Sequence, residues 1–195
     1  MTMTICPRVY LAGPEVFLAN ARAIGAAKCA ICSDHELAGV FPLDGDVDLD
    51  GSSPAEQARR ISLANEDLMR SCDAVIANMT PFRGAAMDSG TAFEVGFMRA
   101  LAKPMFGYSN VATDYAERAR LARSNGLSAA DFDADDVEIE DFGLAENLMI
   151  AVAVSETGPD VVRHASKAAS VRTDLDGFRQ TVLAAAGFFK DKHAS

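Results

Sequence analysis

The order of segments in this chain of 195 residues predicts an α/β protein, in which a parallel sheet is covered by helices on both faces. Short β-prone runs alternate with longer Ala-rich or amphipathic segments, and Gly, Pro or helix-capping residues separate them. We expect residues 1–155 to form this α/β domain and residues 156–195 to form a C-terminal helical extension of the same domain.

The first third of the chain predicts two strands and two helices. A β-prone run, Arg8–Gly13, ends at a Gly-Pro pair, and the Ala-rich segment Val16–Ser33 then predicts a helix. Ala38–Phe41 is a second short strand, which a proline ends, and the acidic loop Leu43–Ser53 follows it. Ser53 then caps a helix that has Pro and Glu at its first and third positions and runs to about residue 71.

The alternation continues through the rest of the chain. The expected elements are, in order, a strand over Asp73–Met79, a helix over Asp88–Ala102, a strand over Lys103–Tyr108, a helix over Asp114–Asn125, a weak fifth strand over Val137–Ile139 and a buried helix over Leu144–Val154. The remaining residues, to about Lys192, are expected to be helical with Gly and Asp interruptions.

The balance of charge excludes some classes of partner. The chain has 28 Asp and Glu residues against 18 Lys and Arg residues, a net charge of −10. Nucleic acids and anionic membranes require clustered positive charge, so neither is an expected partner. No apolar stretch approaches the roughly 20 residues of a membrane span, and no signal peptide is evident. With four cysteines, this predicts a cytoplasmic protein with reduced thiols, and Cys29 and Cys32 are expected to be helical.

The predicted topology selects three loops for a ligand site. In open parallel sheets, ligands bind beyond the carboxyl ends of the strands, near the point where the strand order reverses. The loops 13–16, 79–88 and 108–113 are expected there. The chain contains no dinucleotide-binding, P-loop or nucleophile-elbow motif, and its three His residues lack the spacing of zinc ligands, so no metal site is expected.

Glu94 is the strongest candidate for a catalytic residue. It lies between Phe93 and Val95, in a helix whose first turns line the mouth of the predicted sheet. Burial of a carboxylate among apolar side chains costs free energy unless the group is paired or used. Gly90 and Gly96 leave room for a ligand to approach the backbone. The alternative is an amphipathic helix with Glu94 on its solvent-exposed face.

Asp88 and Ser89 begin the same helix, and Asp88 precedes Glu94 by six residues. Asp88 can be a simple N-cap near the positive end of the helix dipole. Two carboxylates at one mouth can also have different pKa values and divide the roles of acid and nucleophile. The pair therefore remains open to both interpretations.

Two further residues are candidates from their places in the strands. Tyr10 can orient a carboxylate through its hydroxyl, with Gly13 and Pro14 following it at the mouth, or it can be a core aromatic residue. Asp73 begins the third strand, which places it opposite the mouth unless the preceding loop folds back.

Five segments recur in the order that one known family shows. They are Val9–Phe17, Asn65–Ala77, Met87–Gly96, Lys103–Pro104 and Asn147–Ile150. With them the chain resembles the nucleoside 2-deoxyribosyltransferase family over about residues 9–150. The D-x-G-T-A-x-E-x-G block is fairly specific, whereas the other segments gain weight from their order.

The resemblance implies a flavodoxin-like fold, no metal or cofactor, and a homo-oligomer with sites shared between subunits. It implies a nucleoside and a free nucleobase as substrates. Glu94 matches the nucleophile that attacks C1′ of a 2′-deoxynucleoside, and Asp88 matches the residue that contacts the base and helps to protonate it. Tyr10 matches a tyrosine that orients the nucleophile, and Asp73 matches another carboxylate of the site. Asn147 matches an asparagine that reaches into a neighbouring subunit and binds the sugar.

The residue types suit cleavage of an N-glycosidic bond. The sugar gains oxocarbenium character as the base leaves, so a nearby carboxylate stabilises the charge or traps the sugar. Protonation makes the base a better leaving group. Gly13, Pro14, Ser89 and Gly90 are expected to bind substrate at the mouth. Attack by a second base gives transfer, and attack by water gives hydrolysis.

The chain departs from the family in its tail, and three other functions remain open. Some members place a C-terminal Tyr beside the nucleophile, but no Tyr follows Tyr115 here. One alternative is a nucleoside or deoxynucleotide N-glycosidase, with Arg83 and Ser89 near a phosphate. The others are a non-catalytic nucleoside-binding module and a receiver-like phospho-switch, which requires an Asp where this chain has Asn78.

Overall fold

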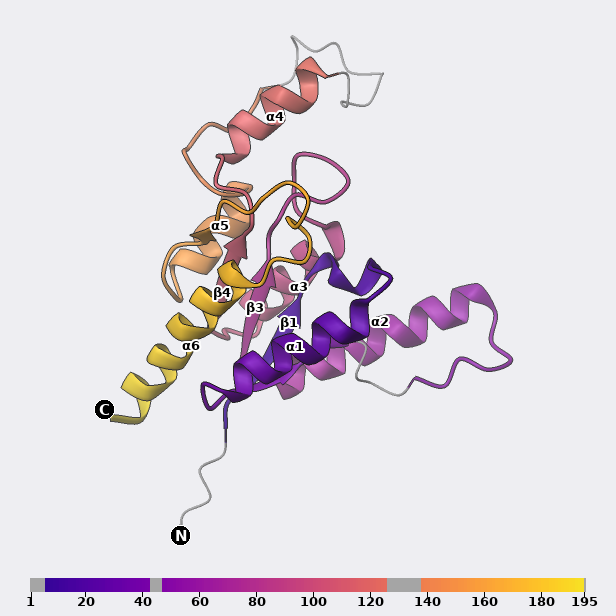
Figure 1. Cartoon of the computed structure of the whole chain (residues 1–195). Coiled ribbons are helices and arrows are strands. Elements are labelled where there is room, and N and C mark those ends of the chain that lie inside the picture. Colours follow the sequence, from indigo (N-terminus) through magenta and orange to yellow (C-terminus); the bar gives the residue numbers. More distant parts are fainter. Residues whose placement is uncertain (1–5, 43–46, 126–137, 195) are drawn as a thin grey trace.

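The computed structural model describes residues 6–42, 47–125 and 138–194, which form a parallel sheet with the strand order β2-β1-β3-β4-β5 (Figure 1). The strands are β1 (Arg8–Ala12), β2 (Ala38–Val40), β3 (Ala74–Asn78), β4 (Met105–Ser109) and β5 (Val162–Arg163). This order is that of flavodoxin-like folds, so the predicted fold class is confirmed.

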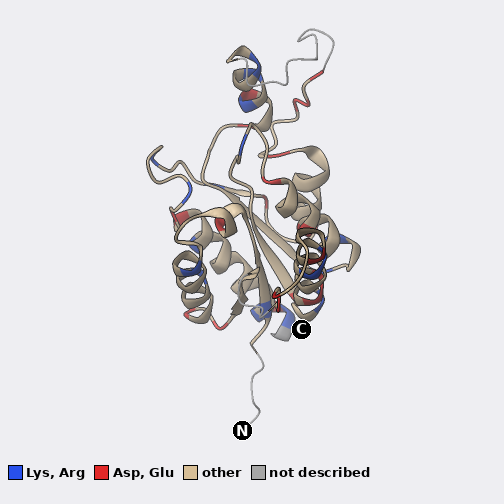
Figure 2. Cartoon of the chain, turned by 90° about the vertical axis from the view of Figure 1, so that its right-hand side faces the viewer, with Lys and Arg blue, Asp and Glu red and all other residues tan. Residues whose placement is uncertain are grey.

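Helices cover both faces of the sheet (Figure 2). One layer consists of α1 (Ala21–Ser33) and α6 (Asp176–Ala194), and the other consists of α2 (Pro54–Ser71), α3 (Ser89–Ala100) and α5 (Leu148–Ser155). The short 3-10 helix η1 (Pro14–Phe17) follows β1, and α4 (Tyr115–Ser124) lies beyond the carboxyl ends of the strands (Figure 1).

Side chains of the strands alternate between two apolar cores, as the pleat of a strand requires. In β1, Val9 and Leu11 face the layer of α1 and α6, whereas Tyr10 and Ala12 face the layer of α2, α3 and α5. All four are completely buried. Tyr10 is therefore a core residue of the layer that contains α3, the helix that carries Glu94.

Helix boundaries follow the capping residues. Ser53 Oγ accepts a hydrogen bond from Glu56 N at 3.3 Å, and α2 begins at the next residue, as predicted. The helix expected over Leu144–Val154 begins later, because Asn147 Oδ1 accepts from Met149 N and caps α5. The helix expected over Val16–Ser33 is split into η1 and α1, where the backbone becomes extended at Leu18.

The fifth strand is not at the position predicted from the sequence. Val137 lies outside the described residues, and Glu138 and Ile139 are not in a strand. β5 is instead Val162–Arg163, in a region expected to be helical. A strand of two residues is too short to show a period-two pattern, so only its pairing with β4 reveals it.

The residues after position 155 complete the main core. Phe178, Val182 and Ala185 of α6 are fully buried against the sheet, in the same cluster as Val9 and Phe106. The C-terminal segment thus contributes an edge strand and a covering helix, and the expectation of an interrupted helix missed the strand.

Two smaller expectations can be compared with the structure. Among the described residues, no helix combines the length and the apolar character needed to cross a membrane. Cys29 and Cys32 lie in α1, as expected, and burial raises the pKa of the Cys32 thiol to about 12.

Candidate active site

The candidate site lies at the carboxyl ends of β1 and β3, where the strand order reverses. From β1 the chain moves outward to β2, and it then returns to β3 on the other side of β1. The loops that follow β1 and β3 meet at this point, which is the usual position for a ligand in such sheets. The N-terminus of α3 follows the second of these loops.

Tyr10 and Glu94 form the central contact of the site. The Tyr10 hydroxyl donates a hydrogen bond of 2.6 Å to Glu94 Oε1. Burial raises the pKa of Glu94 to about 7, and the charges of Asp88 and Glu15 add to this effect, while the hydrogen bond from Tyr10 opposes it. Burial and the adjacent Glu94 also raise the pKa of Tyr10, so its hydroxyl remains a donor at neutral pH. The result is a carboxylate held in one orientation and close to its titration point at pH 7.

Asp88 is both a helix cap and a neighbour of Glu94. Its Oδ2 accepts hydrogen bonds from Thr91 N at 3.0 Å and from Thr91 Oγ1 at 3.3 Å. The side chain is half-buried, and Ser89 and Gly90 after it are exposed. The cap fixes the carboxylate at the start of α3, so the structural role and a role in the site are compatible.

A buried carboxylate that holds the start of α3 was not anticipated from the sequence. Glu146 Oε2 accepts a hydrogen bond from Met87 N at 3.0 Å and lies 3.2 Å from the guanidinium of Arg118. Glu146 is 1% exposed, so this pair anchors the residue just before Asp88 from inside the protein. A Glu directly before the N-cap of α5 was the signal available in the sequence.

A second buried polar network lies beneath the mouth, and it too was missed. Glu15 and Lys28 form an ion pair with side chains 2% and 1% exposed. Glu15 Oε1 also accepts hydrogen bonds from Asn78 Nδ2 at 2.9 Å and from the Tyr108 hydroxyl at 3.0 Å. The network joins η1 to α1 and to the ends of β3 and β4. A single Lys within the Ala-rich helix was its signal in the sequence.

The electrostatics of Glu15 reflect this network. Burial alone would raise its pKa, but the Lys28 ammonium and the Asn78 amide outweigh burial and hold the pKa below its ordinary value. Glu15 is therefore an anion at neutral pH. Its charge is one of the causes of the raised pKa of Glu94.

Gly13 is required by this network. A Cβ atom at position 13 would lie 2.0 Å from Glu15 Oε2 and 3.0 Å from Asn78 Cβ. The sequence suggested that Gly13 makes room for a ligand, and the structure shows that it makes room for Glu15.

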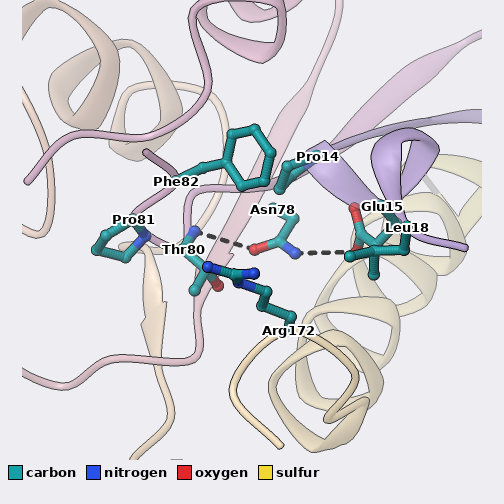
Figure 3. A pocket seen from close by; sticks show the side chains of 8 residues that line it. All are labelled: Pro14, Glu15, Leu18, Asn78, Thr80, Pro81, Phe82 and Arg172. Carbon is teal, nitrogen blue, oxygen red and sulfur yellow. Dashed lines mark hydrogen bonds between the residues drawn. The ribbon is translucent and has the colours of Figure 1, made fainter. Parts of the chain in front are cut away.

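Aromatic residues line the mouth above the network. The rings of Phe17 and Phe82 stack with centroids 5.5 Å apart and planes inclined by 15°. The Arg83 guanidinium carbon lies 4.9 Å from the first ring centroid and 4.7 Å from the second. Pro14, predicted as a substrate contact, lines a shallow hollow beside Phe82 (Figure 3).

Two predicted site residues, Asp73 and Asn147, make other contacts within the chain. Asp73 is exposed at the amino end of β3, where its Oδ2 accepts a hydrogen bond from Arg8 N at 2.8 Å. The structure places Asp73 away from the mouth, because the amino ends of parallel strands lie at the opposite edge of the sheet. Asn147 caps α5, and its Nδ2 donates to Glu140 at 2.8 and 2.9 Å.

One group in the described part of the chain has the residue types of a metal site. His164, Asp174 and Asp176 place ligand atoms within 4.8 Å of one another. Spacing between His residues could not indicate it, because two of the three ligands are carboxylates, from Asp174 just before α6 and from Asp176 at its first position. His164 Nε2 lies 3.3 Å from Asp174 Oδ2, and Asp174 Oδ1 accepts from Asp176 N, so internal contacts already account for this arrangement.

The fold and the site together define a class of protein: a flavodoxin-like α/β protein with a tyrosine-held carboxylate at the switch point of its sheet. Comparison with known sequences makes this more specific. The family model of nucleoside 2-deoxyribosyltransferase matches residues 9–149, and the chain belongs to this family.

Individual proteins are similar to this chain in sequence or in structure. An uncharacterized protein of Schizosaccharomyces pombe is 35% identical over 157 residues, which cover 73% of this chain and 74% of that protein. The structure of a 2-desoxiribosyltransferase from Leishmania mexicana is similar with a TM-score of 0.54 and 30% identity, over 74% of this chain and 85% of that one. A conserved protein from Enterococcus faecalis, 16% identical with a TM-score of 0.54, shares the fold over 91% of this chain and 97% of its own.

The raised pKa of Glu94 predicts the pH dependence of any reaction in which this carboxylate acts. If Glu94 must be ionised to act, kcat/KM rises with pH through about 7, the pKa of this group, and falls about tenfold per unit well below it. The hydrogen bond from Tyr10 lowers the pKa of Glu94, so Tyr10→Phe should move this limb to higher pH. Steady-state rates between pH 5 and 9 measure the limb, and an unchanged midpoint in Tyr10→Phe would contradict the assignment.

Proposed function

We propose that this protein transfers 2-deoxyribose between nucleobases through a covalent intermediate on Glu94. The observation that carries the proposal is the hydrogen bond from buried Tyr10 to Glu94, which holds the carboxylate at the switch point. The tyrosine occupies one carboxylate oxygen, and the other is available to attack C1′ of a bound nucleoside. Membership of the family supports the same reaction.

The proposed reaction has two displacements at C1′. In the first, a Glu94 oxygen bonds to C1′, and the electrons of the N-glycosidic bond leave with the base, which takes up a proton with the help of Asp88. In the second, a ring nitrogen of another base attacks C1′, its proton passes back with the help of Asp88, and the Glu94 carboxylate is released. Two inversions give net retention at C1′. Exposed Ser89 and Gly90, at the start of α3, are proposed to contact the sugar.

The test is an exchange assay. Incubation of the protein with deoxyinosine and adenine is expected to yield deoxyadenosine and hypoxanthine, resolved by chromatography. Incubation with deoxyinosine alone should yield little free deoxyribose. Release of deoxyribose at the same rate with and without adenine, and no deoxyadenosine, would identify a hydrolase and refute transfer.

We further propose that the site is completed by a second copy of the chain. Large apolar side chains are exposed next to the site on α3 and on α5, with Phe93 56% exposed and Met149 74% exposed. Phe93 directly precedes Glu94, and Met149 lies two residues after Asn147. A partner that covers these residues would bring Asn147 to a neighbouring site.

Charge introduced on this surface should therefore separate the subunits. Met149→Glu is expected to give a monomer with much reduced transfer, because a carboxylate cannot be buried in an apolar interface without a partner. Leu121→Glu is the matched control, since Leu121 is 61% exposed on α4. Light scattering measures the mass, and a wild-type protein that is monomeric at assay concentration would contradict the shared site.

A further inference from the structure

The shallow hollow at the mouth has a polar floor between apolar walls (Figure 3). Pro14 and Phe82 form walls, and the Asn78 amide lies between them with Glu15 beside it. Asn78 Oδ1 accepts from Thr80 N at 2.9 Å, and its Nδ2 donates to Glu15. An NH₂ group has two hydrogens, so the amide retains a second one for a ligand.

The hollow and the nucleophile both lie at the carboxyl ends of β1 and β3. Pro14 and Glu15 follow β1 directly, four and five residues after Tyr10, whose hydroxyl holds Glu94. A nucleobase is attached to C1′, the atom that Glu94 is proposed to attack. The base of a bound nucleoside must therefore lie close to this carboxylate, and we assign it to the hollow at the same end of the sheet.

Arg172 reaches the hollow from a turn that is far away in the sequence. The side chain of buried Asn110 fixes this turn, because its Nδ2 donates to the carbonyls of Val171 and Asp174, each at 2.9 Å. Asn110 N donates in turn to Thr80 Oγ1 at 2.9 Å, which ties the turn to the floor of the hollow. Figure 3 shows the Arg172 guanidinium directed towards Thr80 and Asn78. These hydrogen bonds therefore hold the turn that carries Arg172 beside the hollow.

The guanidinium of Arg172 is available to a ligand. Within the part of the chain that the structure describes, it has no ion pair or hydrogen bond, although 28 acidic residues are present in the sequence. Arginine offers up to five N–H donors and no acceptor. Together with the second N–H of Asn78, it places donors on this side of the hollow, while the Glu15 carboxylate, which also lines the hollow, is paired with Lys28 and accepts from Asn78. The preferred ligand edge on the side of Arg172 is therefore one that accepts.

We propose that Arg172 is a specificity-determining residue that selects 6-oxopurines, as in hypoxanthine and guanine nucleosides, over 6-aminopurines. The O6 and N7 atoms of a 6-oxopurine are adjacent acceptors that match the fork of a guanidinium. Adenine presents an amino group in place of O6, and its N–H would face the donors of Arg172. The ring lies against Phe82, which stacks on Phe17. The inference rests on the proposed function for the identity of the ligand as a nucleoside.

The test measures binding without turnover. In a Glu94→Ala background, calorimetry gives the Kd of deoxyinosine and of deoxyadenosine with and without Arg172→Ala. Loss of Arg172 is expected to weaken deoxyinosine about 10- to 100-fold and to change deoxyadenosine by less than about threefold. Arg172→Lys should recover only part of the preference, because an ammonium is not a planar fork. Arg179→Ala removes the same charge from the solvent-exposed face of α6 and should leave both Kd values unchanged.

Other outcomes decide against the inference. Equally weaker binding of both nucleosides would show that Arg172 has a structural role and does not select the base. A loss confined to 5′-monophosphates would make it a phosphate contact. Absence of transfer by the wild-type protein, with the deoxyinosine preference still dependent on Arg172, would refute the proposed function and leave the recognition by Arg172 standing.

Discussion

Replacement of Glu94 by glutamine is expected to reduce deoxyribose transfer by at least about a thousand-fold, as loss of a covalent nucleophile does in other enzymes. The amide retains the shape of the carboxyl group and can still accept the hydrogen bond from Tyr10. It cannot form the ester bond to C1′, so folding should be preserved while chemistry is lost. Rates of base exchange measure the effect, and circular dichroism checks the fold.

The control for this variant is a carboxylate outside the site. Glu117→Gln, on exposed α4, makes the same chemical change and should retain normal exchange. Mass spectrometry of wild-type protein quenched during turnover should find a deoxyribosyl adduct on the peptide that contains Glu94. Near-normal exchange in Glu94→Gln, or an adduct on another residue, would refute the mechanism.

Replacement of Lys28 by methionine should destabilise the protein by about 3–5 kcal/mol, because it leaves the buried Glu15 carboxylate without a counter-ion. The lost contacts of the ammonium with the rings of Tyr108 and Phe178, 5.5 and 4.9 Å from their centroids, act in the same direction. Urea unfolding measures the change. The double variant Glu15→Gln, Lys28→Met should recover part of the loss, since it no longer buries an unpaired charge.

The matched control is an ion pair of the same type at the surface. Lys190 and Glu36 are 3.3 Å apart and both exposed, so Lys190→Met should change the free energy of unfolding by less than about 1 kcal/mol. An effect of Lys28→Met as small as that of Lys190→Met would show that the buried network does not hold the mouth together.

The parts of the fold that were predictable are those with local signals. The capped start of α2 at Ser53 and the apolar strand β3 are visible in residue type and spacing. β5 and the inner face of α6 were not, because a two-residue strand has no periodicity and its position depends on pairing with β4.

The residues of the site also divide into those with a local signal in the sequence and those without one. Glu94, Asp88 and Tyr10 stood out because a carboxylate among apolar residues, a cap and a strand aromatic are unusual in combination, and the structure brings Tyr10 and Glu94 into contact. Glu15 and Lys28 are 13 residues apart on two helices, η1 and α1, and Arg172 comes from a segment far from the other residues of the hollow. No spacing rule relates such residues, so only the folded chain shows them together.

The position of α6 in the core has a consequence for biosynthesis. Phe178 and Val182 fill one face of the central sheet, although they come after the residues that the family model matches. A nascent chain on the ribosome, lacking α6, exposes that face of β4. The core on this face of the sheet therefore cannot be completed before α6 has left the ribosome. The turn that carries Arg172 directly precedes α6, so completion of this core and of the proposed recognition surface depends on the same part of the chain.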